Sequence, residues 1–183
     1  FDTSNVTFMY AMFSYTGYTA MTSLDLGKNF DTSSVTNMNY MFNYTGFTAM
    51  TSLDLGKNFD TSSVTYMSNM FFKTGYKAMT SLDLGDKFDT SNVTDDMRDM
   101  FNNCGYSAMT SLDLGPAFTK IADINTNMFT NTGKSGATIY APESIYKNKT
   151  SFKLSSTDTS TAAGEIAVSD GRTVVPKYKP EWA

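Results

Sequence analysis

Residues 30–58 read FDTSSVTNMNYMFNYTGFTAMTSLDLGKN, and close copies of this stretch fill most of the chain. The copies begin at five phenylalanines, spaced by 29, 29, 29 and 30 residues: Phe1, Phe30, Phe59, Phe88 and Phe118. The first four copies are nearly identical, whereas the fifth keeps Met128, Phe129 and Gly133 and little else. Repeats of about 20 to 50 residues are typical of solenoids and propellers, in which decayed terminal copies act as caps. The repeat therefore decides the fold class.

One half of each copy predicts a β-strand. Residues 21–29, MTSLDLGKN, fit the leucine-rich-repeat pattern L-x-x-L-x-L-x-x-N with Met in the first position. Leu24 and Leu26 alternate with polar residues, which is the period of a strand with one buried face. The signature Asn29 recurs at Asn58 but not in the next two copies. We therefore expect backbone or water contacts to replace an asparagine ladder.

The other half of each copy predicts a short helix. Four apolar residues follow the spacing of one helical face: Val35, Met38, Met41 and Phe42. Residues 31–34 carry side-chain oxygens that cap helix starts, and Gly46 is the expected left-handed stop. In such a stop Phe47 contacts Phe42. The equivalent expected pairs are Phe13–Tyr18, Phe71–Tyr76 and Phe101–Tyr106.

Together the two halves predict an α/β solenoid over residues 1–142. It would be a right-handed, leucine-rich-repeat-like coil of about five turns, with parallel strands on one face and short helices on the other. Residues 143–183 are expected to form a C-terminal cap and tail. There, Glu143 to Phe152 predicts a helix, and residues 165–169 and 172–175 predict a β-hairpin around a type I′ turn at residues 170–171.

Composition excludes several kinds of function. The 183 residues include 14 Lys and Arg, 18 Asp and Glu, one Cys and no His. Without His there is no Ser–His triad, Cys–His pair or His-ligated metal, and one Cys forms no internal disulfide. A net charge of −4 makes nucleic acid a poor partner. No apolar run reaches the length of a membrane span, so we expect no membrane insertion. We also expect no enzymatic activity, because no irregularity that would form a cleft interrupts the four regular copies.

The repeats resemble those of the BspA-like leucine-rich-repeat bacterial surface proteins, a group that includes mycoplasma lipoprotein and Listeria-type surface repeats. The residues that carry the resemblance are FDTSNVT (1–7 and 88–94) and FDTSSVT (30–36 and 59–65), each followed by Met-x-x-Met-Phe and TSLDL. The match covers residues 1 to about 142, although the unit is longer than in the shorter family repeats. The resemblance supplies no catalytic residues.

What the resemblance implies is an exported, extracellular protein of a bacterial cell surface. Its expected function is adhesion to a host or bacterial surface protein or glycan, and we expect the chain to be part of a longer multi-repeat array. A passive spacer that presents another domain is the first alternative. A binder of a regular polysaccharide surface is the second. Regular threonine rows could also match an ice surface, but the adjacent aspartates argue against ice binding, because their charge holds ordinary water.

The sheet face offers one set of candidate ligand-binding residues. Outward positions of the strands repeat unchanged in four copies: Thr22, Ser23, Asp25; Thr51, Ser52, Asp54; Thr80, Ser81, Asp83; Thr110, Ser111, Asp113. Such rows could bind a glycan, a protein strand or a cation, or could be a solvent-facing strand copied by duplication. We expect no cofactor and treat calcium as a hypothesis, because it prefers oxygen ligands and would offset carboxylate repulsion.

The predicted helix face offers a second set of candidates. Its outward positions vary, and the aromatics on it decline toward the fourth copy: Tyr10 and Tyr15 in the first, Tyr40 and Tyr44 in the second. Tyrosine is favoured at interfaces, so one interpretation is a contact patch. Packing against a preceding coil is the alternative.

Two further residue types carry simpler interpretations. Asp31, Asp60 and Asp89 are expected to cap helix starts rather than act as acids or bases. Cys104 stands where other copies have Thr45 or Thr74 and is expected to be a neutral substitution, because no base accompanies it.

Overall fold

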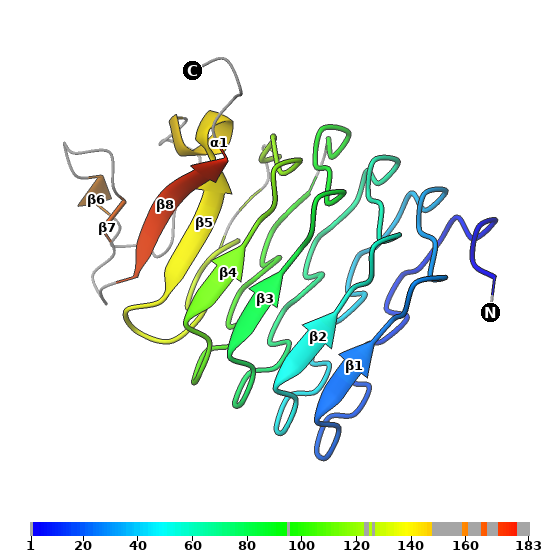
Figure 1. Cartoon of the computed structure of the whole chain (residues 1–183), viewed down its shortest axis with the longest axis horizontal. Coiled ribbons are helices and arrows are strands. Elements are labelled where there is room, and N and C mark those ends of the chain that lie inside the picture. Colours follow the sequence, from blue (N-terminus) through cyan, green and yellow to red (C-terminus); the bar gives the residue numbers. More distant parts are fainter. Residues whose placement is uncertain are drawn as a thin grey trace.

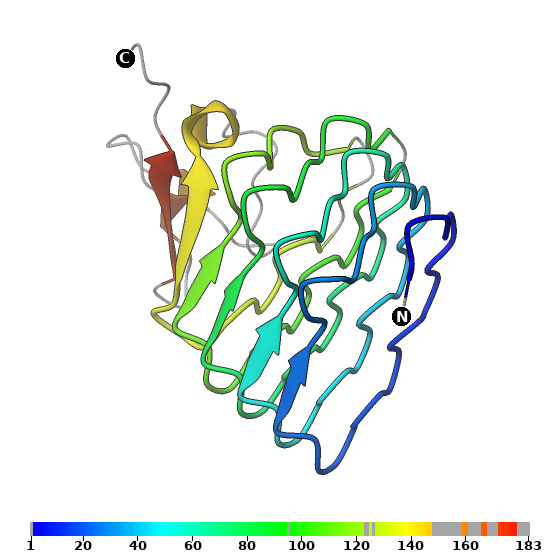
Figure 2. The same cartoon turned by 45° about the vertical axis from the view of Figure 1, so that its right-hand side comes forward.

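The computed structural model describes residues 2–94, 96–122, 125, 127–147, 159–160, 166–167 and 172–178. One short strand recurs in each of the four regular copies: β1 (Ser23–Asp25), β2 (Ser52–Asp54), β3 (Ser81–Asp83) and β4 (Ser111–Asp113). The strands lie side by side, and the rest of each coil returns behind them (Figures 1 and 2). The described residues form a repeat solenoid, which confirms that part of the prediction.

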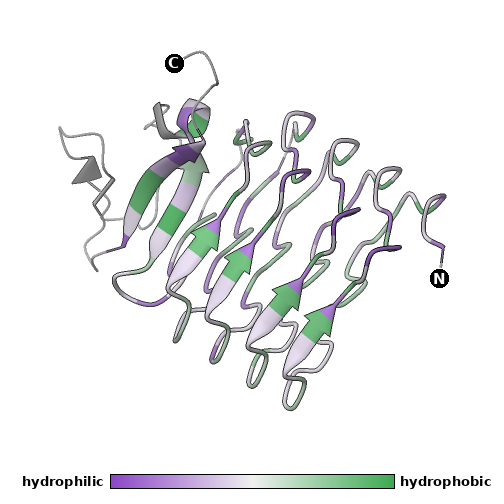
Figure 3. Ribbon diagram, in the orientation of Figure 1, coloured by the Kyte–Doolittle hydropathy of each residue, from purple (hydrophilic) through white to green (hydrophobic). Residues whose placement is uncertain are grey.

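Strand pairing is parallel and matches equivalent residues of successive copies. Leu24 lies opposite Leu53, and Leu82 lies opposite Leu112. The same sheet continues from β4 to β5 (Thr138–Pro142) and from β5 to β8 (Thr173–Tyr178). Among the described strands, β2 and β3 are adjacent but unpaired, so the array contains a two-stranded sheet and a four-stranded sheet. Each of β1–β4 is hydrophobic at its centre and hydrophilic at its end (Figure 3).

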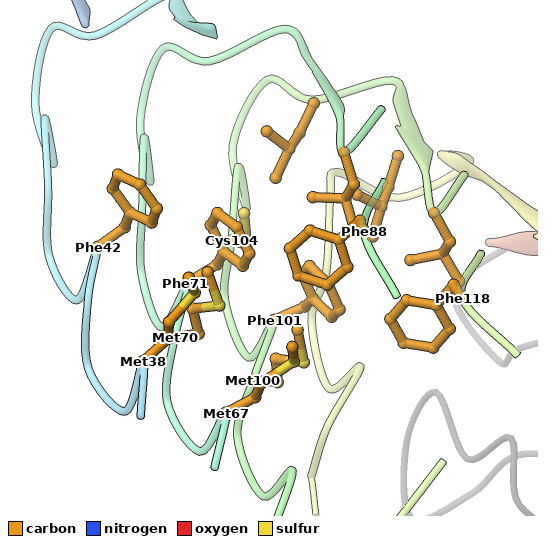
Figure 4. Packing of buried hydrophobic residues seen from close by; sticks show 14 of the residues in the cluster. Met38, Phe42, Met67, Met70, Phe71, Phe88, Met100, Phe101, Cys104 and Phe118 are labelled. Carbon is orange, nitrogen blue, oxygen red and sulfur yellow. The ribbon is translucent and has the colours of Figure 1, made fainter. Parts of the chain in front are cut away.

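Two rows of stacked phenylalanines run through the core, and a coil contributes one ring to a row. Their centroids lie 5.3 to 5.4 Å apart in the row Phe13, Phe42, Phe71, Phe101 and Phe129. A second row, Phe59, Phe88 and Phe118, has spacings of 6.2 to 6.3 Å. Methionines such as Met67 and Met100 belong to the same buried cluster (Figure 4). Packing between coils, rather than within one coil, therefore supplies the core.

The helices predicted for the second half of each copy are wrong, because the described residues there form consecutive turns. Between residues 40 and 46, odd-numbered N–H groups donate to the carbonyl three residues earlier. Even-numbered N–H groups donate to a neighbouring coil instead. An α-helix would use these donors within its own segment. Here half of them join the coils to one another.

Left-handed residues explain why no helix forms. Tyr40 and Tyr44 have φ values of 60° and 56°. The equivalent positions of the other copies are also left-handed: Ala11, Tyr15, Asn69, Lys73, Asp99, Asn103, Asn127 and Asn131. Asn and Asp tolerate this conformation better than other residues with a side chain, and they hold half of the ten positions. The apolar spacing of three and four residues reflects successive turns rather than helical periodicity.

The predicted glycine stop is confirmed in conformation but not in its contacts. Gly46 has a φ of 56°, and a Cβ there would lie 2.2 Å from the Met50 Cβ. The ring of Phe42 stacks on those of Phe13 and Phe71, whereas Phe47 stacks on Tyr18 and Tyr76. In the described residues both rings stack on neighbouring coils, and Phe47 pairs within its own coil with Tyr44 rather than with Phe42.

Buried threonines join successive coils where an asparagine ladder would otherwise do so. The Thr32 hydroxyl donates to the carbonyl of Asp60 and accepts from its N–H, both at 2.7 Å. Thr3 and Thr90 form the same two-way contact with the coil that follows each of them. Asn58 instead donates to the Lys28 carbonyl near the surface. The FDTS sequence thus carries this structural ladder.

The C-terminal pairing differs from the predicted hairpin. The strand predicted at residues 172–175 exists, but as β8 it pairs in parallel with β5. The preceding β7 (Ile166–Ala167) pairs antiparallel with β6 (Thr159–Ser160). Residues 170–171, the predicted turn, lie outside the described residues. The predicted helix begins as expected, as α1 (Glu143–Lys147), and its continuation to residue 152 also lies outside them.

Candidate functional site

The candidate residues of the sheet face lie where the strand pattern placed them. Threonine, serine and aspartate of the first three copies are exposed, from Thr22 to Asp83. Each aspartate holds the turn that follows its strand, since Oδ1 of Asp25, Asp54 and Asp83 accepts the N–H of the glycine two residues later at 2.7, 2.8 and 2.9 Å. We call Asp25, Asp54, Asp83 and Asp113 the aspartate row.

The aspartate row gives the calcium hypothesis no support. Within the part of the chain that the structure describes, no three acidic or Cys side chains lie close enough to share a metal ion. The hydrogen bond from the glycine N–H supplies a structural reason for the conserved spacing Asp-x-Gly within the copies. Because Oδ1 accepts one N–H, its second lone pair and Oδ2 are left for a ligand in the three exposed copies.

The fourth copy differs at its aspartate, which the C-terminal strand covers, whereas Thr110 is exposed and Ser111 is half-buried. Asp113 is only 8% exposed. Its Oδ2 forms an ion pair with Lys177 Nζ, and its Oδ1 accepts the Tyr178 hydroxyl at 2.8 Å. The Asp113 carboxylate raises the pKa of Lys177 above its ordinary value. Burial, followed by the hydrogen bond to Asp113, raises the pKa of Tyr178.

A groove lies between β2 and β3, where the sheet is interrupted. Its volume is about 650 Å³, and Asp54, Lys57, Asp83, Asp86 and Lys87 line it together with Tyr178. The glycines after the strands show the same opening. A Cβ on Gly115 would lie 2.2 Å from the Gly85 carbonyl oxygen, whereas one on Gly85 would meet nothing within 4 Å. We call this feature the β2–β3 groove.

The four candidate tyrosines lie on the turn segments rather than on helices. Tyr10 and Tyr15 are 59% and 56% exposed, whereas Tyr40 and Tyr44 are half-buried. The Tyr10 and Tyr40 centroids are 5.6 Å apart, and those of Tyr15 and Tyr44 are 4.7 Å apart. In the third coil Lys73 takes the next position of this row and donates to the Tyr44 hydroxyl at 3.1 Å.

A longer set of rings, which the sequence analysis missed, extends this patch. Seven rings are linked by centroid distances of 4.7 to 6.2 Å, and we call them the surface aromatic ladder: Tyr15, Tyr18, Tyr44, Phe47, Phe72, Tyr76 and Tyr106. The aromatic after each glycine stop belongs to it. The Gly–aromatic spacing was a sufficient signal, but we assigned those rings to contacts within a coil.

Part of the ladder is a parallel stack that presents ring edges, although Tyr44 and Phe72 meet edge to face at 62°. The planes of Tyr18 and Phe47 differ by 1°, and those of Phe47 and Tyr76 by 7°. Rings stacked in this way cover one another's faces, so their C–H edges and hydroxyls are what face solvent. Tyr18 and Tyr106 are exposed, and Phe47 and Tyr76 are half-buried.

The aspartates predicted to cap helix starts cap turns instead, whereas the burial of Cys104 fits a neutral substitution. The Asp31 carboxylate accepts the Ser33 N–H at 2.9 Å, and this bond lowers its pKa; no helix follows, so the cap stabilises a turn. Asp60 and Asp89 accept the equivalent N–H groups. Cys104 is fully buried, and burial raises the pKa of its thiol, which does not favour a nucleophile.

Comparison of the sequence with known protein families identifies one family that matches it. Residues 1–112 match the family described as "Mycoplasma protein of unknown function, DUF285". The chain belongs to this family. No curated protein and no solved structure matches it. In the described residues no helix combines the length and apolar character needed to cross a membrane.

Proposed function

We propose that the chain is a non-enzymatic binding module of a bacterial cell-surface protein, which adheres to a host or bacterial surface protein through the surface aromatic ladder. The observation that carries the proposal is a continuous strip of seven partly exposed aromatic rings across successive coils. Tyrosine is enriched at the centres of protein interfaces, where a rigid ring buries area at low entropic cost.

The exposed edges favour a protein over a glycan as the partner. A sugar that stacks on an aromatic platform needs a free ring face, and stacking between coils covers these faces. Hydroxyls at the edge offer donors and acceptors for a partner backbone, and Tyr44 also contacts the Lys73 ammonium, 5.1 Å from its ring centroid. The ladder therefore resembles the mixed apolar and polar character of a protein interface.

The location and architecture belong to the same proposal. Membership of a family described from mycoplasma fits a bacterial source, and the repeat motifs resemble those of exported surface proteins. We propose that the module lies outside the cell. Its fold would be a right-handed, leucine-rich-repeat-like coil, and it would form part of a longer repeat array. The uniform sheet face also fits the passive spacer, so the experiment includes that outcome.

The test is a binding array of host-matrix proteins, bacterial surface proteins and glycans, probed with this chain. The ladder variant changes two rings of the surface aromatic ladder, with Tyr15→Asn and Tyr44→Asn, and also the other candidate pair, with Tyr10→Ser and Tyr40→Asn. The replacements come from equivalent positions of other coils, so that the backbone conformation is retained. These copy Ser68, Asn103 and Asn69. The control variant changes the sheet face instead, with Ser23→Ala, Ser52→Ala and Ser81→Ala.

Retained protein binding by the control and loss by the ladder variant supports the proposal. Loss by the control alone moves the site to the sheet face. Binding of glycans only would support the polysaccharide alternative, and a chain that binds nothing on the array would support the spacer.

A further inference from the structure

We propose a second docking site on the sheet face, where an extended, lysine-bearing segment of a protein partner binds. Two exposed members of the aspartate row, Asp54 and Asp83, hold this segment from either side of the β2–β3 groove. The site is separate from the surface aromatic ladder, because none of the ladder's rings lines the groove. It therefore does not depend on the proposed function above.

One aspartate of this row, Asp113, already binds side chains of the same chain. At Asp113 two consecutive residues of β8 supply the ligands: the Lys177 ammonium on Oδ2 and the Tyr178 hydroxyl on Oδ1. Asp113 also accepts the Gly115 N–H at 3.1 Å, as every other aspartate of the row accepts the N–H of its glycine. The register of β8 against β5 skips Lys177, and this irregularity lets two consecutive side chains reach one carboxylate. A Lys-Tyr pair on an irregular strand is thus the chemistry that fits this aspartate.

Within the described part of the chain, Asp54 and Asp83 present the same acceptor with no side-chain donor on it. Asp54 and Asp83 follow the same Ser-Leu dipeptide in equivalent strands, and their Oδ1 atoms are held by Gly56 and Gly85 at 2.8 and 2.9 Å. Both residues are exposed, unlike Asp113. Because the glycine bond fixes the carboxylate, binding a lysine orders few additional groups, which favours affinity.

The interrupted sheet supplies room for the backbone of such a segment. The β2–β3 groove has a volume of about 650 Å³ beside both aspartates, and β2 and β3 belong to different sheets. One backbone hydrogen bond, from the Thr80 N–H to the Thr51 carbonyl at 3.4 Å, joins the two coils just before the strands. Unpaired strand edges are recognised by extended peptides. Three carboxylates and two ammonium groups line the groove: Asp54, Asp83, Asp86, Lys57 and Lys87. The two lysines select against a uniformly basic segment, so an isolated lysine beside an aromatic residue fits best.

The test uses a fluorescein-labelled peptide with the sequence of β8, TVVPKY, capped at both ends, and the full chain. Fluorescence anisotropy should show saturable binding to the wild type. Asp54→Asn with Asp83→Asn should weaken it roughly tenfold, since each exposed charge pair contributes a modest amount. Asn keeps the oxygen that accepts the glycine N–H, so the fold is retained. A peptide with Gln in place of Lys should lose binding to a similar extent.

The matched control is Asp60→Asn with Asp89→Asn, which removes the same charge from the FDTS segments. This variant should bind like the wild type. Equal weakening by both double variants would show general electrostatics and overturn the site. Loss with Asp113→Asn instead would show that the peptide displaces β8, and undiminished binding of the Gln peptide would refute the requirement for lysine. No binding to the wild type would also overturn the proposal.

Discussion

At the scale of single residues, the threonines that join coils decide stability more than the aspartates that the motif displays. Each buried hydroxyl satisfies a carbonyl of the following or preceding coil, whereas each aspartate holds a local turn near solvent. A buried donor or acceptor left without its partner costs more than an exposed one. The residues that vary least among the copies are therefore mostly structural.

Thr32→Val should lower the free energy of unfolding by about 1 to 3 kcal/mol, because it removes both hydrogen bonds between the buried Thr32 hydroxyl and the half-buried backbone of Asp60. Equilibrium unfolding in urea measures the change. Thr19→Val at an exposed position is the control and should change stability by less than about 0.5 kcal/mol. Similar effects at both sites would contradict the stabilising role of the threonine hydrogen bonds between coils.

Cys104→Thr should stabilise the chain by about 1 kcal/mol. In the neighbouring coils the equivalent Thr74 and Thr132 hydroxyls donate to a phenylalanine carbonyl at 2.7 and 2.9 Å, and the substitution restores this bond to Phe71. Urea unfolding again provides the measurement. Cys104→Val has the same shape without the hydroxyl, so an equal gain with Val would show that packing, rather than the hydrogen bond, matters.

At the scale of elements, the interruption between β2 and β3 gives equivalent glycines different surroundings, so their replacement by alanine should have different costs. Gly85→Ala should cost about 1 to 2 kcal/mol, the strain of its left-handed backbone alone. Gly115→Ala should cost clearly more, because its Cβ would also lie 2.2 Å from the Gly85 carbonyl oxygen. Thermal and urea unfolding of the two variants compare these costs. Equal destabilisation would mean that the groove closes in solution.

The contact between β8 and Asp113 should make stability depend on alkaline pH. The Tyr178 pKa is raised above its ordinary 10.0, so the neutral phenol stabilises the folded state below about pH 10 and this contribution is lost as pH rises through the folded pKa. The wild type should therefore lose stability relative to Tyr178→Phe above that pH. Melting temperatures between pH 7 and 11 measure it, and a constant difference would contradict the contact.

At the scale of the whole molecule, stability should be nearly a sum over neighbouring coils. Deletion of residues 59–87 joins Asn58 to Phe88 in the same register as the natural junction of copies. The product should still fold, with aromatic stacking visible in near-UV circular dichroism, and should unfold at a lower urea concentration with a smaller m-value. Complete loss of folded structure would show that the β2–β3 interruption is required, contrary to a repeat array.

The sequence alone determined the periodicity, the positions of the strands, the left-handed glycines and the core phenylalanines and methionines, because equivalent residues in a 29-residue repeat must occupy equivalent places. It also located the exposed rows of the sheet face. It misassigned the turn segments, since Met38 and Met41 have a spacing shared by helices and by successive turns. Only hydrogen bonds between coils distinguish the two.

Tertiary structure alone decided three features. The rings after the glycines stack between coils rather than on the phenylalanine of their own coil, because a parallel array brings rings at equivalent positions to stacking distance. β8 joins β5 and places Lys177 and Tyr178 on Asp113, a pairing of distant residues that local pattern does not encode. The groove between β2 and β3 arises although these copies are nearly identical in sequence. Local pattern fixes each coil, whereas packing between coils fixes the surfaces available for binding.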